Sequence, residues 1–267
     1  MGKEKIKFRD ANIAYTISGE GKTLVLLHGF IESTVIWKDF VPVLENQFQV
    51  VCIDLPGHGE SDCIGYVHEM EVNAEVVRAV LQHLQIKACV LVGHSMGGYV
   101  TLAFAEKYPE LLSGICLFHS TGLPDSDAKK LDRDKAISVV KKDAQVFIST
   151  VIPNLFAPVN KEKFKQEIEE LIRLAAQTPV QGIVATLEGM KNRKDRTPVL
   201  KTVNFPVLFI GGKQDIVVPL DTLLPQLSLP KHCQSLILDN VGHTGFIEAK
   251  DETLSMLFNF AKSCLKN

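Results

Sequence analysis

The sequence lacks a large excess of charge of either sign, because its 29 lysine and arginine residues nearly balance its 31 aspartate and glutamate residues. The formal net charge at pH 7 is therefore only -2. Such a surface has no single-sign field to gather phosphates or anionic lipid, so we expect neither nucleic acid nor a membrane surface as a partner. The sequence also lacks the run of about 18 apolar residues that a membrane-spanning helix needs.

Cysteine is scarce and shows no metal-binding or redox spacing. None of the six cysteines forms a CxxC pair, and Cys52, Cys89 and Cys116 lie within apolar runs that are typical of buried strands. The basic residues near the N-terminus are not followed by an apolar run, so we expect no export signal. Together these absences predict reduced core cysteines in a cytoplasmic protein.

No cofactor or metal motif is complete. The segment 21–23 reads Gly-Lys-Thr, like the end of a phosphate-binding loop, but Thr16 occupies the position of the first glycine of that loop. The pair Gly57 and Gly59 is followed by Asp62, where a dinucleotide-binding loop requires glycine. No histidines, cysteines or carboxylates recur at metal-ligand spacing. We therefore expect chemistry that uses neither a cofactor nor a metal ion.

The 267 residues, 46% of them hydrophobic, are enough for one large core. Short apolar runs that end at Gly, Pro or Asp alternate with segments of helical period, which predicts an α/β fold with a mostly parallel sheet and helices on both faces. The expected strands are 23–27, 49–53, 88–92, 114–118, 207–210 and 235–238. Residues 5–17 alternate in polarity around a turn, and this pattern predicts an antiparallel hairpin at the sheet edge.

This alternation stops between residues 121 and 203. No strand-like run occurs there; instead Asn160 can cap one helix and Thr178, followed by proline, opens another. An all-helical insertion into an α/β chain predicts a helical cap. We therefore expect a cap at 121–203 over a core formed by residues 1–120 and 204–267.

The sharpest chemical signal is the segment 93–98, Gly-His-Ser-Met-Gly-Gly, which follows an expected strand and precedes a helical segment. A serine on so tight a turn has a strained backbone, and only small residues at Gly93 and Gly97 let the turn close. The first N–H groups of the following helix point toward negative charge that develops beside the serine. This G-x-S-x-G pattern predicts that Ser95 is a nucleophile.

Three further motifs accompany this turn: His-Gly-Phe at 28–30, Asp-Leu-Pro-Gly-His-Gly-Glu-Ser at 54–61, and Gly-Gly-Lys-Gln-Asp at 211–215. With them the chain resembles the α/β-hydrolase superfamily over nearly its whole length. The resemblance implies the α/β-hydrolase fold and an oxyanion hole formed by the backbone N–H groups of Phe30 and Met96. The motif residues His28, His58 and His94 are expected to shape loops.

A serine needs a base to remove its proton, and the base needs a partner that fixes its tautomer. His243 follows the last expected strand, at the sheet edge where reactive groups gather, while His119 is a weaker candidate for the base. Asp215 follows a strand through a Gly-Gly turn and is the expected acid, with Asp239 as the alternative. The order Ser95, Asp215, His243 is the order that this fold requires.

These residues predict a serine hydrolase that cleaves an ester-like acyl bond of a small, mainly apolar substrate through an acyl-enzyme. A carbon–carbon bond hydrolase, a thioesterase, a cofactor-free perhydrolase or a slow-turnover ligand receptor can use the same residues. Apolar side chains from 147–156 and 184–190, together with Phe30 and Met96, are expected to line the substrate pocket. The oligomeric state has no readable signal.

Overall fold

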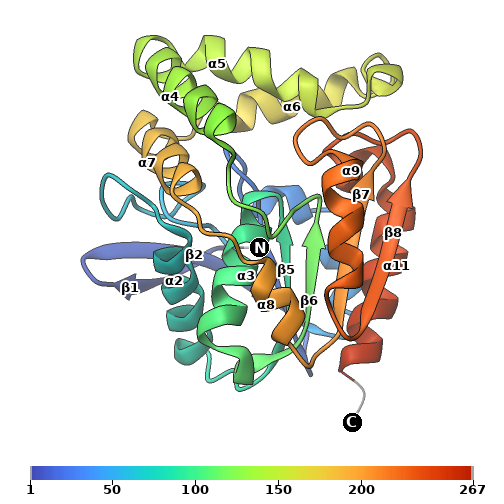
Figure 1. Cartoon of the computed structure of the whole chain (residues 1–267). Helices are drawn as coiled ribbons and strands as arrows, with labels where there is room; N and C mark the ends of the chain where they lie inside the picture. The colour runs from blue at the N-terminus through green and yellow to red at the C-terminus, as the bar shows by residue number, and fades with distance from the viewer. Residues whose placement is uncertain (1, 266–267) are drawn as a thin grey trace.

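The structure is a computed structural model that describes residues 2–265, and within them eight strands form one sheet (Figure 1). The strands are β1 (Glu4–Phe8), β2 (Ala11–Ser18), β3 (Thr23–Leu27), β4 (Gln49–Ile53), β5 (Cys89–His94), β6 (Leu112–Phe118), β7 (Val207–Gly212) and β8 (Cys233–Leu238). Their spatial order is β1-β2-β4-β3-β5-β6-β7-β8. The β1–β2 hairpin and its pairing with β4 are antiparallel, and the pairs from β4 to β8 are parallel. The expected fold class and edge hairpin are confirmed.

Helices cover both faces of the sheet. They are α1 (Val41–Leu44), α2 (Met70–His83), α3 (Met96–Lys107), α4 (Asp127–Lys142), α5 (Ala144–Val151), α6 (Lys165–Ala175), α7 (Val180–Lys191), α8 (Thr197–Thr202), α9 (Leu220–Leu223), α10 (Gly245–Glu248) and α11 (Lys250–Cys264). Because successive strand side chains point to opposite faces, Val25 packs with α2 and α3, while Leu24 packs in a second cluster with α1 and α11. The sheet is therefore buried on both faces, and this packing fixes the carboxyl ends of its strands.

Helices α4, α5, α6 and α7 form a layer above the carboxyl ends of the strands, which we call the helical layer (Figure 1). It lies within the segment for which a cap is predicted. The expected helix after Thr178 is present as α7. The prediction that Asn160 is the N-cap residue of a helix is wrong, because α6 begins only at Lys165. The Asn160 side-chain amide instead donates to the Asn240 carbonyl and to Glu248.

The strand cysteines Cys52, Cys89 and Cys116 are buried and unpaired, in agreement with their prediction as core residues. Burial raises the pKa of the Cys52 and Cys89 thiols to about 12, so both remain protonated and unreactive at neutral pH. Among residues 2–265, no helix combines the length and the apolar character that crossing a bilayer demands.

Candidate active site

Ser95 lies on a sharp turn between β5 and α3. Its backbone φ of 49° lies in a region that residues other than glycine rarely adopt, so the turn is strained as predicted. A Cβ atom at Gly93 would collide with the backbone of Gly97, and one at Gly97 would lie 2.7 Å from the carbonyl oxygens of Leu27 and His28. Glycine is therefore required at both positions. The absence of a side chain at Gly97 also lets the end of β3 pack against the turn.

The structure brings together the three predicted side chains Ser95, Asp215 and His243. The Ser95 Oγ lies 2.8 Å from Nε2 of His243, and Nδ1 of His243 lies 2.8 Å from Oδ2 of Asp215. All three residues are at most 9% exposed. Because a carboxylate only accepts hydrogen bonds, Nδ1 of His243 carries a proton and donates it in a hydrogen bond to Asp215, which leaves Nε2 facing the Ser95 hydroxyl.

Asp215 is surrounded by donors. Its Oδ1 accepts hydrogen bonds from the backbone N–H groups of Val217 and Val218, at 2.8 and 2.9 Å. Burial alone would raise the pKa of Asp215, but the charge of His243 and the hydrogen bonds from His119 and His243 hold it well below its usual range. Asp215 is therefore ionised and fixes the orientation of His243.

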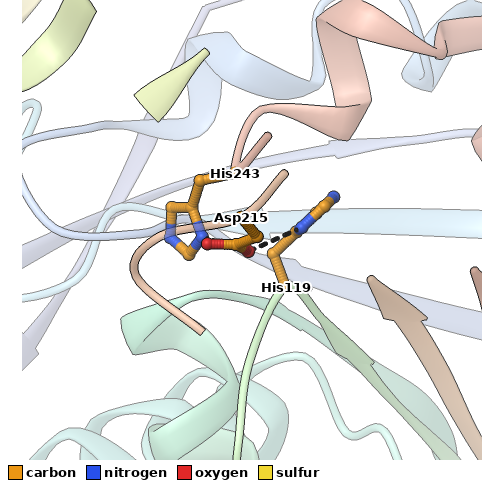
Figure 2. Close-up of side chains that lie close together, drawn as sticks. All are labelled: His119, Asp215 and His243. Carbon is orange, nitrogen blue, oxygen red and sulfur yellow. Dashed lines mark hydrogen bonds and ion pairs between the residues drawn. The ribbon is translucent and has the colours of Figure 1, made fainter. Parts of the chain in front are cut away.

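His119, the alternative base, contacts the acid rather than the serine. Figure 2 shows the His119 and His243 rings on either side of the Asp215 carboxylate, and His119 Nδ1 lies 3.0 Å from Oδ2. Burial lowers the pKa of His119 despite this carboxylate, so the ring is neutral and donates its Nδ1–H. The atoms of His119, Asp215 and His243 that could coordinate a metal ion lie within 4.8 Å of one another. A metal ion among them would have to displace the contact that orients His243.

The alternative acid, Asp239, lies elsewhere. Its exposed side chain pairs with Lys213, with the Lys213 Nζ 2.6 Å from Oδ1 of Asp239. The motif histidines have structural contacts: His28 accepts a hydrogen bond from the Leu55 N–H at 2.9 Å, and His58 is buried against the His28 ring. Their positions agree with the expectation that they shape loops.

A buried pair that the sequence did not reveal lies beside the serine. His94 places Nδ1 2.9 Å from Oε2 of Glu32 and Nε2 2.9 Å from the carbonyl oxygen of His243. Both acceptors require an N–H, so His94 is protonated on both nitrogens. Burial alone would lower the pKa of His94, but Glu32 raises it overall. Glu32 also accepts from the Gly29 N–H, which links the loop before Phe30 to the serine turn.

The two backbone groups proposed for the oxyanion hole lie at neighbouring element ends. Met96 is the first residue of α3, so its N–H has no acceptor within that helix. Phe30 follows β3, and its loop is held against the serine turn by the close contact of Gly97 with His28. The fold therefore places both segments beside Ser95.

A cavity of about 200 Å³ opens over Ser95 and His243, between the sheet and the helical layer. Its wall includes the expected apolar residues Phe30, Phe147, Leu187 and Met190, and the Phe30 and Phe147 rings meet edge to face at 6.2 Å. Met96 does not line the cavity, since its side chain is buried in the core. The wall also contains Lys129, Asp132 and Arg133 of α4, which were not predicted to line the pocket.

Glu248 joins the helical layer to the loop that carries His243. Its carboxylate accepts hydrogen bonds from the Ala157 and Gly242 N–H groups, the Asn160 amide and the Thr244 hydroxyl. The His243 N–H also donates to the Leu155 carbonyl, at 2.6 Å. Residues 155–160 and 242–248 therefore form one connected unit.

The family model of the alpha/beta hydrolase fold matches residues 22–250, so the chain belongs to this family and is a hydrolase. It is 30% identical over 244 residues to the uncharacterized hydrolase YugF of Bacillus subtilis, covering 88% of this chain and 87% of that protein. It is 28% identical to 2-hydroxy-6-oxononadienedioate/2-hydroxy-6-oxononatrienedioate hydrolase 1 of Pseudomonas putida, covering 94% of this chain and 92% of that one. The malate-bound structure of a thermophilic esterase from Thermogutta terrifontis is similar at a TM-score of 0.94 and 28% identity, with both chains fully covered.

Proposed function

We propose that this hydrolase cleaves small carboxylic esters with Ser95 as nucleophile, His243 as base and Asp215 as the acid that orients His243. The observation that carries the proposal is the continuous hydrogen-bonded chain from Ser95 Oγ through His243 to an ionised Asp215, at the floor of a cavity. A serine hydroxyl held by a base that is oriented in this way is suited to attack a carbonyl carbon.

The proposed cycle has two halves. His243 takes the proton from Ser95 as Oγ attacks the carbonyl carbon, and the N–H groups of Phe30 and Met96 hold the oxyanion. His243 then donates the proton to the leaving alcohol, which leaves an acyl group on Ser95. A water molecule, deprotonated by His243, attacks this acyl group and restores the free serine.

The cavity supports a small substrate. Its volume of about 200 Å³ is below the 300 to 1,000 Å³ typical of pockets for drug-sized ligands, and its walls near Ser95 are mainly apolar. We propose that residues 121–203 act as a cap that closes this space, since α4, α5 and α7 supply much of the wall.

Carbon–carbon bond hydrolysis is a second candidate. The Pseudomonas putida relative is named for cleaving a dienedioate, and the similarity extends along nearly the whole of both chains. The basic residues Lys129 and Arg133 in the cavity wall favour this candidate, because a dienedioate carries carboxylates. The malate in the Thermogutta terrifontis esterase is also a dicarboxylate.

Steady-state kinetics with p-nitrophenyl esters and with 2-hydroxy-6-oxononadienedioate separate the candidates. We expect multiple turnovers of the esters and labelling of Ser95 by a fluorophosphonate probe. Asp215→Asn is expected to lower ester turnover by up to about 10⁴-fold, because the wrong His243 tautomer is favoured. Faster turnover of the dienedioate would favour carbon–carbon cleavage, and a single slow turnover of every compound would indicate a receptor.

A further inference from the structure

One wall of the cavity is basic. Lys129 and Arg133 are one helical turn apart on α4 and both face the cavity that contains Ser95. Both are partly buried, and the Arg133 side chain is only 13% exposed. Their cationic groups are thus held beside a mainly apolar space, in which the charged residues Glu32 and His94 pair with each other.

The carboxylates around this wall do not balance its positive charge. Arg133 Nε and Arg193 Nη1 both bind the buried carboxylate of Asp125, at 2.8 and 2.5 Å, so two guanidinium groups share one acid. Asp132 also lines the cavity, but its side chain is 63% exposed and pairs with Lys135 at 3.1 Å. An exposed carboxylate that is already paired neutralises little of the charge inside the cavity.

Lys129 is the cation without a partner here. Among residues 2–265 its ammonium group has no hydrogen bond or ion pair, whereas the adjacent Lys130 pairs with Asp127 at 3.7 Å. Burial and then the charge of Arg133 lower the pKa of Lys129 overall, although the carboxylates of Asp125 and Asp132 act in the opposite direction. A bound carboxylate would relieve both effects.

We propose that Lys129, supported by Arg133, binds a carboxylate of the substrate, so that the preferred substrates are small esters carrying one free carboxylate at the end remote from the scissile bond. This inference rests on the proposed ester hydrolysis at Ser95. The apolar wall formed by Phe30, Phe147 and Leu187 contacts the carbon chain, and the basic wall contacts its anionic end. A charge-assisted hydrogen bond in such a site favours the anionic ester by at least about tenfold.

The test compares esters of matched length. In the first arm the anionic esters carry the carboxylate on the acyl side. This arm compares kcat/KM for p-nitrophenyl hemisuccinate, hemiglutarate and hemiadipate with kcat/KM for p-nitrophenyl butyrate, valerate and hexanoate. In the second arm the anionic esters carry the carboxylate on the alcohol side. This arm compares kcat/KM, measured by pH-stat, for the butyryl esters of glycolate and lactate with kcat/KM for ethyl butyrate. We expect a preference of at least about tenfold for the anionic ester in one arm.

Variants then assign the preference to Lys129. Lys129→Met is expected to lower the ratio of anionic to neutral kcat/KM by about tenfold or more, mainly through KM, and Lys129→Arg to retain most of it. Lys130→Met is the matched control, since Lys130 does not line the cavity, and it should leave the ratio unchanged.

The outcomes distinguish this inference from the proposed function. Turnover of neutral esters with no anionic preference in either arm, or a preference that Lys129→Met retains, overturns the basic subsite alone. Absence of turnover for every ester overturns the proposed ester hydrolysis instead. Raising the salt concentration should reduce the preference, because a partly exposed ammonium group is screened.

Discussion

His119 offers the most informative perturbation, because it contacts Asp215 and under the proposed function would position this acid rather than serve as the base. His119 has a φ of 49°, a conformation that asparagine adopts more readily than most residues. The amide nitrogen of asparagine also reaches about as far as Nδ1 of histidine. His119→Asn can therefore keep both the backbone and the donor to Asp215, while His119→Ala loses the donor.

The size of the effect follows from the hydrogen bonds at Asp215. A hydrogen bond to a charged group contributes about 1.5 to 3 kcal/mol, which would correspond to about 10 to 150-fold in kcat if all of it were lost in the transition state. Asp215 retains its bonds from Val217, Val218 and His243. We therefore expect the lower end, a loss of about tenfold for His119→Ala, and activity within about threefold of wild type for His119→Asn.

Both variants are assayed with p-nitrophenyl butyrate across pH 5 to about 9, with circular dichroism as the control for folding. Loss of the bond from His119 should raise the pKa of Asp215, but the bonds from Val217, Val218 and His243 keep Asp215 ionised, so the acid limb should keep its position in both variants and only the height of the His119→Ala profile should fall. A loss of about 10³-fold in folded protein for both variants would refute this reasoning and make His119 the base.

Three further predictions follow from the site. Ser95→Ala should remain folded but lose at least about 10³-fold in kcat, and near wild-type activity would contradict its role. With neutral p-nitrophenyl esters, kcat/KM should rise from acetate to about butyrate or hexanoate and then fall as the cavity fills, since apolar contact contributes about 25 cal/mol per Å²; a steady rise to long chains would contradict this. Glu32→Gln should lower the pKa of His94, as measured by NMR titration. The raised pKa of His94 stabilises the fold below about pH 6.5, and the lowered pKa of Glu32 stabilises it above about pH 4.3. Both contributions are present between these two pH values. The Glu32→Gln variant should therefore lose most stability in this range and least at alkaline pH.

The central strands could be predicted from the sequence because they are buried on both faces. The ranges predicted for β3 and β4 match the structure, since an uninterrupted apolar run is the signature of such strands. The edge strand β8 begins at Cys233, two residues before its predicted start, because its first residues are partly exposed and polar. Asn160 is the clearest failure: the local sequence suits a helix cap, but partners distant in the sequence take its amide.

At the site, the sequence predicted residues whose position depends on local turns. Ser95, Asp215 and His243 each follow a strand, and the order of the strands brings them together. Glu32 could not be found in this way, because its partner His94 is 62 residues away. The bond from His119 to Asp215, across 96 residues, is equally invisible in the local pattern.

The connections of Glu248 limit how this enzyme can be re-engineered by exchanging segments. A graft of the helical layer alone would separate the segment 155–160 from its acceptors on 242–248. Gly242 adds a steric constraint, since a Cβ there would lie 2.6 Å from the Ala157 nitrogen. A chimera that replaces one segment must therefore carry the other from the same parent, or its histidine loop will lose its alignment with the serine.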